Sequence, residues 1–293
     1  MLIETTEGAQ AEPRPARKPR VMAARRSGMP PLREYMSEVV DRRQFIWHMA
    51  RTNLKGKHFD SVLGQLWLIL DPILLAAVYY MLRSVVRPMG SDPAARTALI
   101  THLIWAVSFF YFTRGVALGG AKSVLGNKRL VLNASFPRLI LPLTALVTAV
   151  IEFIPTLGIY LLFHAFMGQP ITMNLVFLLP ILILQVTFNF GFGLLLAPAM
   201  VNYRDINGFI TYFLRVWLYA SPVLYTVAEI PAGLETYLRW NPLYPLYASL
   251  EQVFGGSPPS VDYLLAALAW AVTSLVIGMI VFMRKEGGLA IRL

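Results

Sequence analysis

The sequence contains no cysteine and few charged residues for its length. Only 14% of the 293 residues are Asp, Glu, Lys or Arg, whereas soluble domains contain about 25%. Without cysteine, a disulfide framework and thiolate chemistry are excluded. Hydrophobic residues make up 56% of the chain, so the composition indicates an integral membrane protein.

Clusters of catalytic or metal-ligating residues are also scarce. The four histidines are scattered, and no carboxylates stand near them at metal-ligand spacing, so we expect no metal site and no enzymatic activity. Gly119-Gly120-Ala121-Lys122-Ser123 superficially resembles a phosphate loop, but it lacks the G-x-x-x-x-G-K-[ST] frame and no strand precedes it. We expect this chain to bind no cofactor; if ATP drives it, a separate subunit must bind ATP and Mg.

Long apolar stretches occur six times along the chain. A helix needs about 20 apolar residues to cross a bilayer, and six segments qualify. We predict spanning helices at about 61–83, 97–120, 139–166, 171–202, 206–225 and 261–283. The predicted fold is therefore an all-α membrane protein whose residues 61–293 form one six-helix transmembrane domain.

The distribution of basic residues predicts the orientation of these helices. Of the 26 Lys and Arg residues, 21 fall on the side of the two termini, four fall on the other side, and Arg215 lies within a spanning segment. Basic loops stay on the cytoplasmic side. We therefore expect a multi-pass protein of the cytoplasmic (inner) membrane with both termini in the cytosol, and the charge indicates topology rather than nucleic-acid binding.

Three segments outside the spanning helices have distinct compositions. Residues 1–32 are rich in Pro, Arg and Ala and predict a disordered basic tail. Residues 33–60 mix apolar and basic side chains, which favours an amphipathic helix on the membrane surface. Residues 226–260 predict two short outer helices, broken at Asn241-Pro242; both are too short to span, so they would be re-entrant or interfacial.

A short basic segment, residues 121–138, separates the second and third predicted spans. Lys122, Lys128, Arg129 and Arg138 provide four cations, and no acidic residue lies among them. Apolar residues between the cations favour a short helix along the membrane surface. A turn should follow, because the residue before Pro137 avoids the α region. On charge alone, the segment would also fit an ordinary cytosolic loop.

Three ionisable residues fall within the predicted spans, and such residues are candidates for function. Asp71 precedes Pro72, a pattern that also fits a helix N-cap, and Glu152 precedes a proline-containing stretch. Arg215 lies with aromatic residues at helical spacing, so this face should contact protein or water rather than lipid. The aromatic residues that could line a sugar channel with it, or simply pack, are Trp67, Tyr79, Trp105, Phe109, Phe112, Phe209, Tyr212 and Tyr219.

The basic segment and its surroundings resemble a known family. Residues 127–142, NKRLVLNASFPRLILP, resemble the N-x-x-L-I-x-x-x-x-F-P-R-x-I-L-P segment of ABC-2 type permeases that export polysaccharides. Residues 63–72, 203–206, 221–225 and 241–243 resemble further motifs of these permeases, in the same order. The resemblance covers most of residues 35–290.

This resemblance implies a homodimeric permease that pairs with two ATPase subunits. It would move a lipid-linked polysaccharide or polyol-phosphate polymer outward, such as O-antigen, capsule, teichoic acid or actinobacterial cell-wall galactan. The family's coupling helix, which docks on the ATPase, corresponds here to Lys128, Arg129, Leu130, Asn133, Phe136, Pro137 and Arg138.

The diphosphate of the lipid carrier would be gathered by basic residues of the interfacial helix, since Arg pairs bidentately with phosphate. These residues are Arg42, Arg43, Arg51 and Lys55. Two alternatives stay open: an ABC-2 exporter of drugs or lipids, and a proton-coupled secondary transporter that relies on Asp71, Glu152 and His164.

Overall fold

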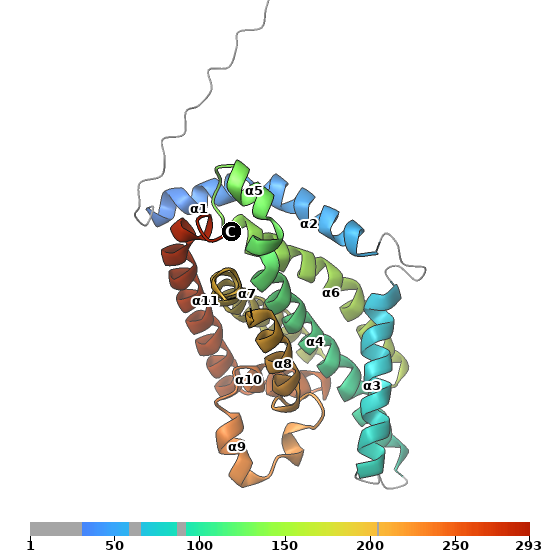
Figure 1. The fold of residues 1–293 in the computed structure, drawn as a ribbon. Helices are drawn as coiled ribbons and strands as arrows, with labels where there is room; N and C mark the ends of the chain where they lie inside the picture. Colours follow the sequence, from blue (N-terminus) through green and yellow to red (C-terminus); the bar gives the residue numbers. More distant parts are fainter. Residues whose placement is uncertain (1–30, 59–65, 87–91, 204) are drawn as a thin grey trace, which may run out of the picture.

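The computed structural model describes residues 31–58, 66–86, 92–203 and 205–293, and every regular element in these ranges is a helix. Residues 1–30 of the predicted tail and the start of the first predicted span, residues 61–65, lie outside them. The helices run side by side as one bundle, with short helices at both ends (Figure 1). This confirms the all-α part of the predicted fold.

Four segments are long and apolar enough to cross a membrane. They are α4 (Pro93–Gly126), α6 (Ile140–Phe166), α7 (Leu178–Asn202) preceded by the 3₁₀ helix η2 (Met173–Phe177), and α11 (Val261–Leu289). Each lies where a spanning helix was predicted, because apolar length is the property that a bilayer selects.

The other two predicted spans are not among these four, as judged from the residues that the structure describes. The first corresponds to α3 (Trp67–Val86), whose apolar stretch is Ile73–Val85, and the fifth to α8 (Ile206–Tyr219). The 14 residues of α8 extend about 21 Å, less than the hydrocarbon core of about 30 Å. This helix ends before residue 225 because Pro222 lacks the N–H that would continue it. Helix length therefore does not establish six spans, which stay a prediction.

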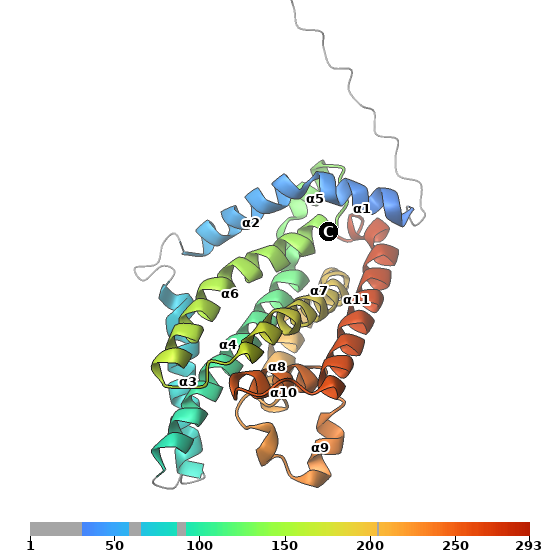
Figure 2. The ribbon, with the colours of Figure 1, turned by 180° about the vertical axis from the view of Figure 1, so that it is seen from behind.

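Short helices gather at one end of the bundle. They are α1 (Leu32–Asp41), α2 (Arg43–His58) and α5 (Lys128–Asn133), and the C-terminus lies beside them (Figure 1). Figure 2 shows α2 lying across the end of α6. The single helix predicted for residues 33–60 is two helices, because Arg42 leaves the helical conformation with φ −92° and ψ 16°.

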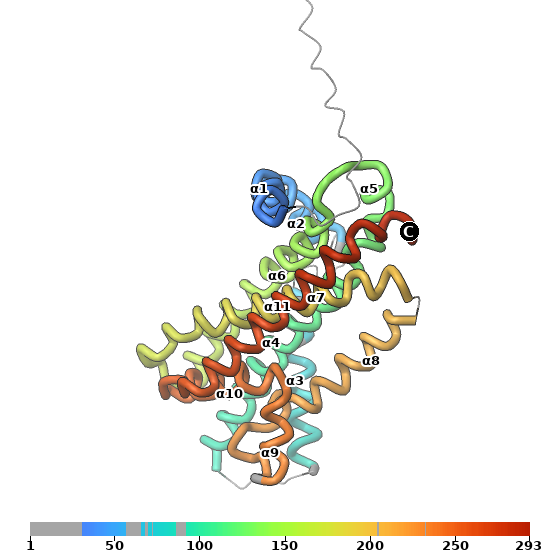
Figure 3. Tube along the Cα trace, turned by 90° about the vertical axis from the view of Figure 1, so that its left-hand side faces the viewer, coloured from blue at the N-terminus to red at the C-terminus, as the bar shows by residue number. Residues whose placement is uncertain are grey.

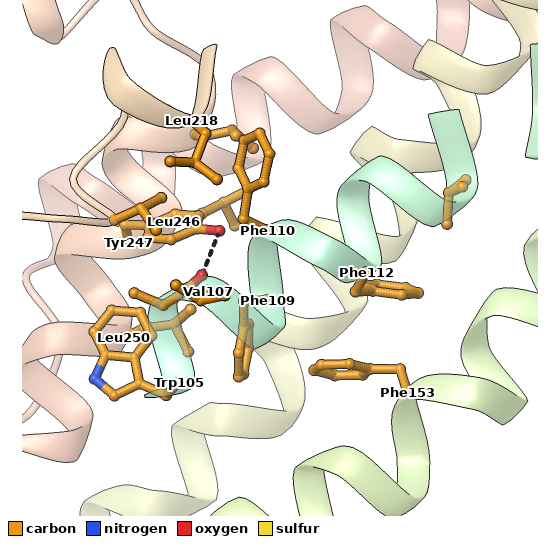
Figure 4. Close-up of a cluster of buried hydrophobic side chains, with 14 of the residues drawn as sticks. Trp105, Val107, Phe109, Phe110, Phe112, Phe153, Leu218, Leu246, Tyr247 and Leu250 are labelled. Atoms are coloured by element: carbon orange, nitrogen blue, oxygen red, sulfur yellow. Dashed lines mark hydrogen bonds between the residues drawn. The ribbon is translucent and has the colours of Figure 1, made fainter. Parts of the chain in front are cut away.

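The opposite end carries η3 (Val227–Glu229), α9 (Ala232–Leu238) and α10 (Leu243–Phe254) (Figure 1). Two short helices are thus present where the outer pair was predicted. Leu243, Leu246, Leu250 and Phe254 of α10 are buried against the bundle. The Tyr247 hydroxyl donates a hydrogen bond to the carbonyl of Ala106 in α4 at 3.2 Å (Figure 4). These contacts show a helix packed on the bundle; they do not establish that the pair is re-entrant.

Glycines bring α7 against a neighbour on two sides. A Cβ atom on Gly191 would collide with the backbone of Ser274 in α11, and one on Gly120 of α4 would lie 2.9 Å from the Cα of Gly193. Within a membrane, packing two helices together gains little from the hydrophobic effect, because lipid is as apolar as the side chains. Helices there associate through close backbone packing at small residues. The central layer α4–α7–α11 therefore depends on these glycines.

Gly191→Ala should destabilise the bundle, because the added methyl group meets backbone that cannot rotate away. Overpacking of this kind costs about 1–3 kcal/mol. The matched control is Gly158→Ala in α6, where nothing lies within 4 Å of the new Cβ. Thermal unfolding in one detergent would compare them; equal stability of the two variants would contradict the close α7–α11 contact.

Candidate functional site

Three distant segments meet around one carboxylate at the end of the bundle that carries α1, α2 and α5. Glu286 of α11 is only 8% exposed. Its Oε2 accepts a hydrogen bond from the Tyr35 hydroxyl at 2.7 Å, and its Oε1 accepts one from the Arg138 backbone N–H at 2.8 Å. The Arg138 guanidinium also donates to the carbonyl oxygen of Glu286. The Leu139 N–H donates to the Tyr35 hydroxyl oxygen at 3.3 Å. We call this set the Glu286 clamp.

The clamp satisfies a group that would otherwise be expensive to bury. A buried carboxylate without partners strongly destabilises a fold, whereas here each oxygen accepts from a donor on a different segment. An apolar cluster surrounds it: Phe136 lies 6.5 Å from Phe45 between ring centroids, and Leu139, Phe282 and others pack beside them. The turn that follows α5 is therefore fixed to both α1 and α11.

The predicted coupling residues fall into two groups in the structure. Lys128, Arg129 and Asn133 are exposed on α5, and Leu130 is half-buried. Phe136 and Pro137 are buried and Arg138 is half-buried in the clamp, so these three anchor the segment rather than face outward. We call the exposed residues Lys128, Arg129 and Asn133 the α5 face.

The four basic residues predicted to gather a diphosphate lie on α2 or at its start. Arg43 and Lys55 are exposed. Arg42 pairs with Glu38 at 3.1 Å, and the Arg51 guanidinium lies 4.7 Å from the centre of the Trp47 ring. Two of the four cations thus already engage neighbouring side chains.

Two of the aromatic residues predicted to line a channel are packed inside the chain. Trp105 is 2% exposed and Phe109 is 0% exposed. The Trp105 and Phe254 ring centroids are 5.4 Å apart in a tilted contact. Those of Phe109 and Phe153 are 5.1 Å apart in an edge contact (Figure 4), and both contacts are typical of a core. This geometry favours packing for both residues, an alternative that the sequence left open.

The aromatic face of α8 is exposed instead. Phe209, Tyr212, Arg215 and Tyr219 lie on the outside of this helix, which runs along one flank of the bundle (Figure 3). The Arg215 guanidinium lies 5.7 Å from the centre of the Tyr212 ring. Tyr219 contacts Tyr79 of α3 edge-to-face at 6.4 Å. A single chain therefore leaves an arginine and several aromatic rings uncovered.

A cavity of about 300 Å³ lies among α3, α4 and α6. Trp67 and Phe112, both predicted to line a channel, border it together with the ionisable residues Asp71, Arg114 and Glu152. Asp71 falls in the second turn of α3, so it is not that helix's N-cap. Among the described residues, no group of three His, Asp or Glu side chains could hold a metal ion.

Sequence reasoning missed Glu286 and Tyr35. Tyr35 falls in the segment predicted only as an amphipathic helix, although its hydroxyl takes part in the clamp. Glu286 is the only acidic residue after Asp262 and follows two cations, Arg284 and Lys285. A single carboxylate just after a predicted spanning helix was the sequence feature that could have indicated a buried ionic contact.

The other end of the bundle is held by carboxylates of the outer segment. Arg83 of α3 forms an ion pair with Glu229 of η3. The backbone N–H of Val227 donates to Glu251 of α10 at 2.9 Å. Burial raises the pKa of Glu251, the Val227 hydrogen bond partly offsets this shift, and the negative charge of Glu229 adds to it. The outer segment thus partly buries the Glu251 carboxylate, which favours its protonated form.

With this geometry established, comparison with known proteins defines the class. Residues 44–254, more than two thirds of the chain, match the ABC-2 type transporter family. The chain therefore belongs to the ABC-2 type transporter family, and the resemblance inferred from the basic segment is confirmed.

The chain is also similar to individual members. It is 27% identical over 247 residues to the O-antigen export system permease protein RfbA of Myxococcus xanthus, covering 81% of this chain and 93% of that protein. It is 24% identical over 238 residues to an RfbA protein of Klebsiella pneumoniae, covering 80% and 89%. The similarity thus extends over nearly the whole length of these relatives.

Glu286→Gln should destabilise the fold, because an amide cannot accept at both oxygen positions and leaves one donor unmatched. A lost hydrogen bond to a charged group costs about 1.5–3 kcal/mol. Tyr35→Phe removes a donor to the same carboxylate. The Tyr35→Phe/Glu286→Gln double variant should therefore lose less stability than the sum of the two single variants. Glu34→Gln, exposed on α1, should stay within about 0.5 kcal/mol of the unaltered chain. A Glu286→Gln protein as stable as this control would show that the clamp does not hold the turn.

Glu251→Gln should raise stability at pH values above those at which an ordinary carboxyl group ionises. Because the folded-state pKa of Glu251 is raised, its contribution is fully present below the unfolded pKa and is lost as pH rises through the folded value. The hydrogen bond from Arg239 lowers the pKa of Glu235, so the pH dependence of its contribution is reversed. This contribution is present above the unfolded pKa and is lost as the pH falls, and Glu235→Gln should abolish it. Thermal unfolding between about pH 4 and pH 8 would separate them. Parallel pH profiles for the unaltered and Glu251→Gln chains would contradict the burial of this carboxylate.

Proposed function

We propose that this chain is the transmembrane subunit of an ATP-driven exporter, which moves a lipid-linked polysaccharide outward across the cytoplasmic membrane. Membership of the ABC-2 family supports the permease role, and similarity to O-antigen export permeases supports a polysaccharide substrate. In this proposal the chain hydrolyses no ATP. Two partner ATPase subunits bind ATP and Mg and supply the force.

The observation that carries the proposal is the attachment of the α5 face. A surface that receives a push must be accessible to the partner and firmly joined to the helices that move. Lys128, Arg129 and Asn133 are exposed, while the turn directly after them is held by the Glu286 clamp to α1 and α11. The segment thus combines an open contact surface with a rigid base.

The exposed face of α8 supports a homodimer. An arginine in contact with lipid near the centre of a membrane costs about 2.5–3.5 kcal/mol on insertion scales. A second copy placed against α8 and α3 would remove Arg215 from lipid and enclose a passage lined by Phe209, Tyr212 and Tyr219. In this arrangement α3 and α8 are the remaining two of six spanning helices, and both termini are cytosolic. During export, α3 and α8 move apart.

One observation favours a proton-coupled transporter as the second candidate. Asp71 and Glu152 border the same cavity, as a proton site would require. The two candidates differ in energy source. Export that collapses under a protonophore at constant ATP would favour the second, whereas export that follows ATP supply would favour the first.

Arg129→Glu should weaken binding of the ATPase subunit. Reversing a charge at an electrostatically complementary interface costs several kcal/mol, so we expect the dissociation constant to rise about a hundredfold or more and export to fall. The matched control is Arg33→Glu, an equal charge change at an exposed site on α1. Both variants would be co-expressed with a candidate ATPase subunit, and its retention on the purified permease would be measured. Equal retention by the two variants would place coupling elsewhere, and robust ATP hydrolysis by the lone chain would remove the proposal.

A further inference from the structure

The cavity among α3, α4 and α6 carries more charge than an apolar bundle requires. Asp71, Arg114 and Glu152 come from three different helices and border one space of about 300 Å³. Ionisable residues at membrane depth are costly and face cavities or partners that use them. Three of them border this one cavity, so its lining offers charged groups to an occupant.

A second cavity lies next to this one, under α2. It measures about 410 Å³ and shares two lining residues, Gly115 and Ala149, with the first. Its remaining walls include Asn53 of α2 and Lys122 of α4. We call the two spaces the inner and the outer cavity. Because they share the wall residues Gly115 and Ala149, we treat them as one compartment, which begins at the interfacial helix.

The depth of the compartment follows from helix geometry. Lys122 and Arg114 are two turns apart on α4, which corresponds to about 12 Å. Glu152 lies roughly 18 Å along α6 from Ile140 at its start. A headgroup admitted beside α2 at the level of Lys122 would thus lie about two helical turns from Arg114.

The inner cavity combines three kinds of surface. The carboxylates of Asp71 and Glu152 accept hydrogen bonds, and the guanidinium of Arg114, held 5.3 Å from the centre of the Tyr111 ring, donates them. Phe112 also borders the cavity and is stacked on Phe153, with 4.7 Å between ring centroids.

The indole of Trp67, 40% exposed, adds an open aromatic surface to the same walls. The inner cavity thus offers hydrogen-bond acceptors, one hydrogen-bond donor and flat apolar surfaces. This combination fits a neutral sugar ring, which carries many hydroxyl groups.

Other occupants fit this set less well. A phosphate would meet two carboxylates and a single guanidinium, so the balance of charge opposes it. An organic cation would suit the carboxylates and the aromatic rings but would lie against Arg114. A sugar ring uses every group: its hydroxyls donate to Asp71 and Glu152 and accept from Arg114, while its C–H face covers an aromatic ring.

We propose that the inner cavity is a saccharide subsite, which takes the lipid-proximal sugar of a glycolipid from the inner leaflet while the phosphate stays in the outer cavity near Lys122. The substrate class rests on the proposed export function; the location rests on the two cavities. The occupied compartment lies beside α2, so the interfacial helix forms one wall of the path by which the headgroup is admitted.

The chain's lack of cysteine permits a direct test. Ala149→Cys places the only thiol in the wall shared by both cavities, and the full chain would be reconstituted in lipid nanodiscs. Labelling by a charged methanethiosulfonate reagent would be timed with farnesyl diphosphate, with its glucose-, galactose- and N-acetylglucosamine-capped forms, and with tetraphenylphosphonium. Leu132→Cys, exposed on α5, is the control that no probe should protect.

We expect Ala149→Cys to be labelled, and at least one sugar-capped probe to slow labelling more than farnesyl diphosphate does. Adding Glu152→Gln should raise the concentration for half-protection by about tenfold, the effect of one charged hydrogen bond. No labelling, equal protection by capped and uncapped probes, or protection by tetraphenylphosphonium alone would each overturn the subsite. Failed protection in a chain that exports polymer with its ATPase would remove the subsite only; successful protection in a chain that never pairs with an ATPase would remove only the proposed function.

Discussion

The buried carboxylate of Glu286 determines how one end of this protein is held together. Tyr35 and Glu286 are 251 positions apart in the chain, yet the hydroxyl of one satisfies the carboxylate of the other. The α5 helix has only six residues, and so short a helix has no stability of its own in water. Its position therefore depends on the turn that follows it, and that turn depends on Glu286. An apolar pair could join the same helices, but it would not fix the backbone N–H of Arg138 at one point.

The bundle divides into a closely packed layer and a looser flank. In α4, α7 and α11 the backbones approach through glycines, so these three helices behave as one body. In contrast, α3 meets the outer segment and α8 through individual contacts, the Arg83–Glu229 ion pair and the Tyr79–Tyr219 ring contact. Contacts of this kind can be exchanged one at a time, whereas the other face of α8 packs Leu214 and Trp217 into the core. The contacts that α3 makes with η3 and α8 are thus the part of the flank suited to rearrangement.

The sequence predicted the long helices because a bilayer imposes a simple requirement on length and polarity. The third predicted span, 139–166, is nearly the observed α6, and the turn at Pro137 follows from a local steric rule. The break at Arg42 and the end of α8 at Tyr219 were not predicted, since hydropathy does not register where a helix stops inside an apolar stretch.

The candidate site was less predictable than the fold. The stripe of Trp105 and Phe109 has the same spacing whether it packs or lines a channel, and only the neighbours Phe153 and Phe254 distinguish the two. The partnership of Tyr35 with Glu286 left no periodic pattern, because it joins residues from opposite ends of the chain. The motif at 127–142 located the α5 segment but could not separate its exposed residues from its anchors.

Gly191 and Gly193 give α7 backbone contact on two sides, and this restricts the motions open to it. Any twist of α7 about its own axis would carry larger neighbours, such as Phe192 or Leu194, into the backbone of α4 or α11. The α7 helix therefore cannot rotate about its own axis, but it can move as a rigid body together with α4 and α11. The α5 helix follows α4 directly in the chain. A force applied to α5 would therefore shift or tilt α4, α7 and α11 together. Rotation of α7 alone would not transmit it, because the close backbone contacts oppose that rotation.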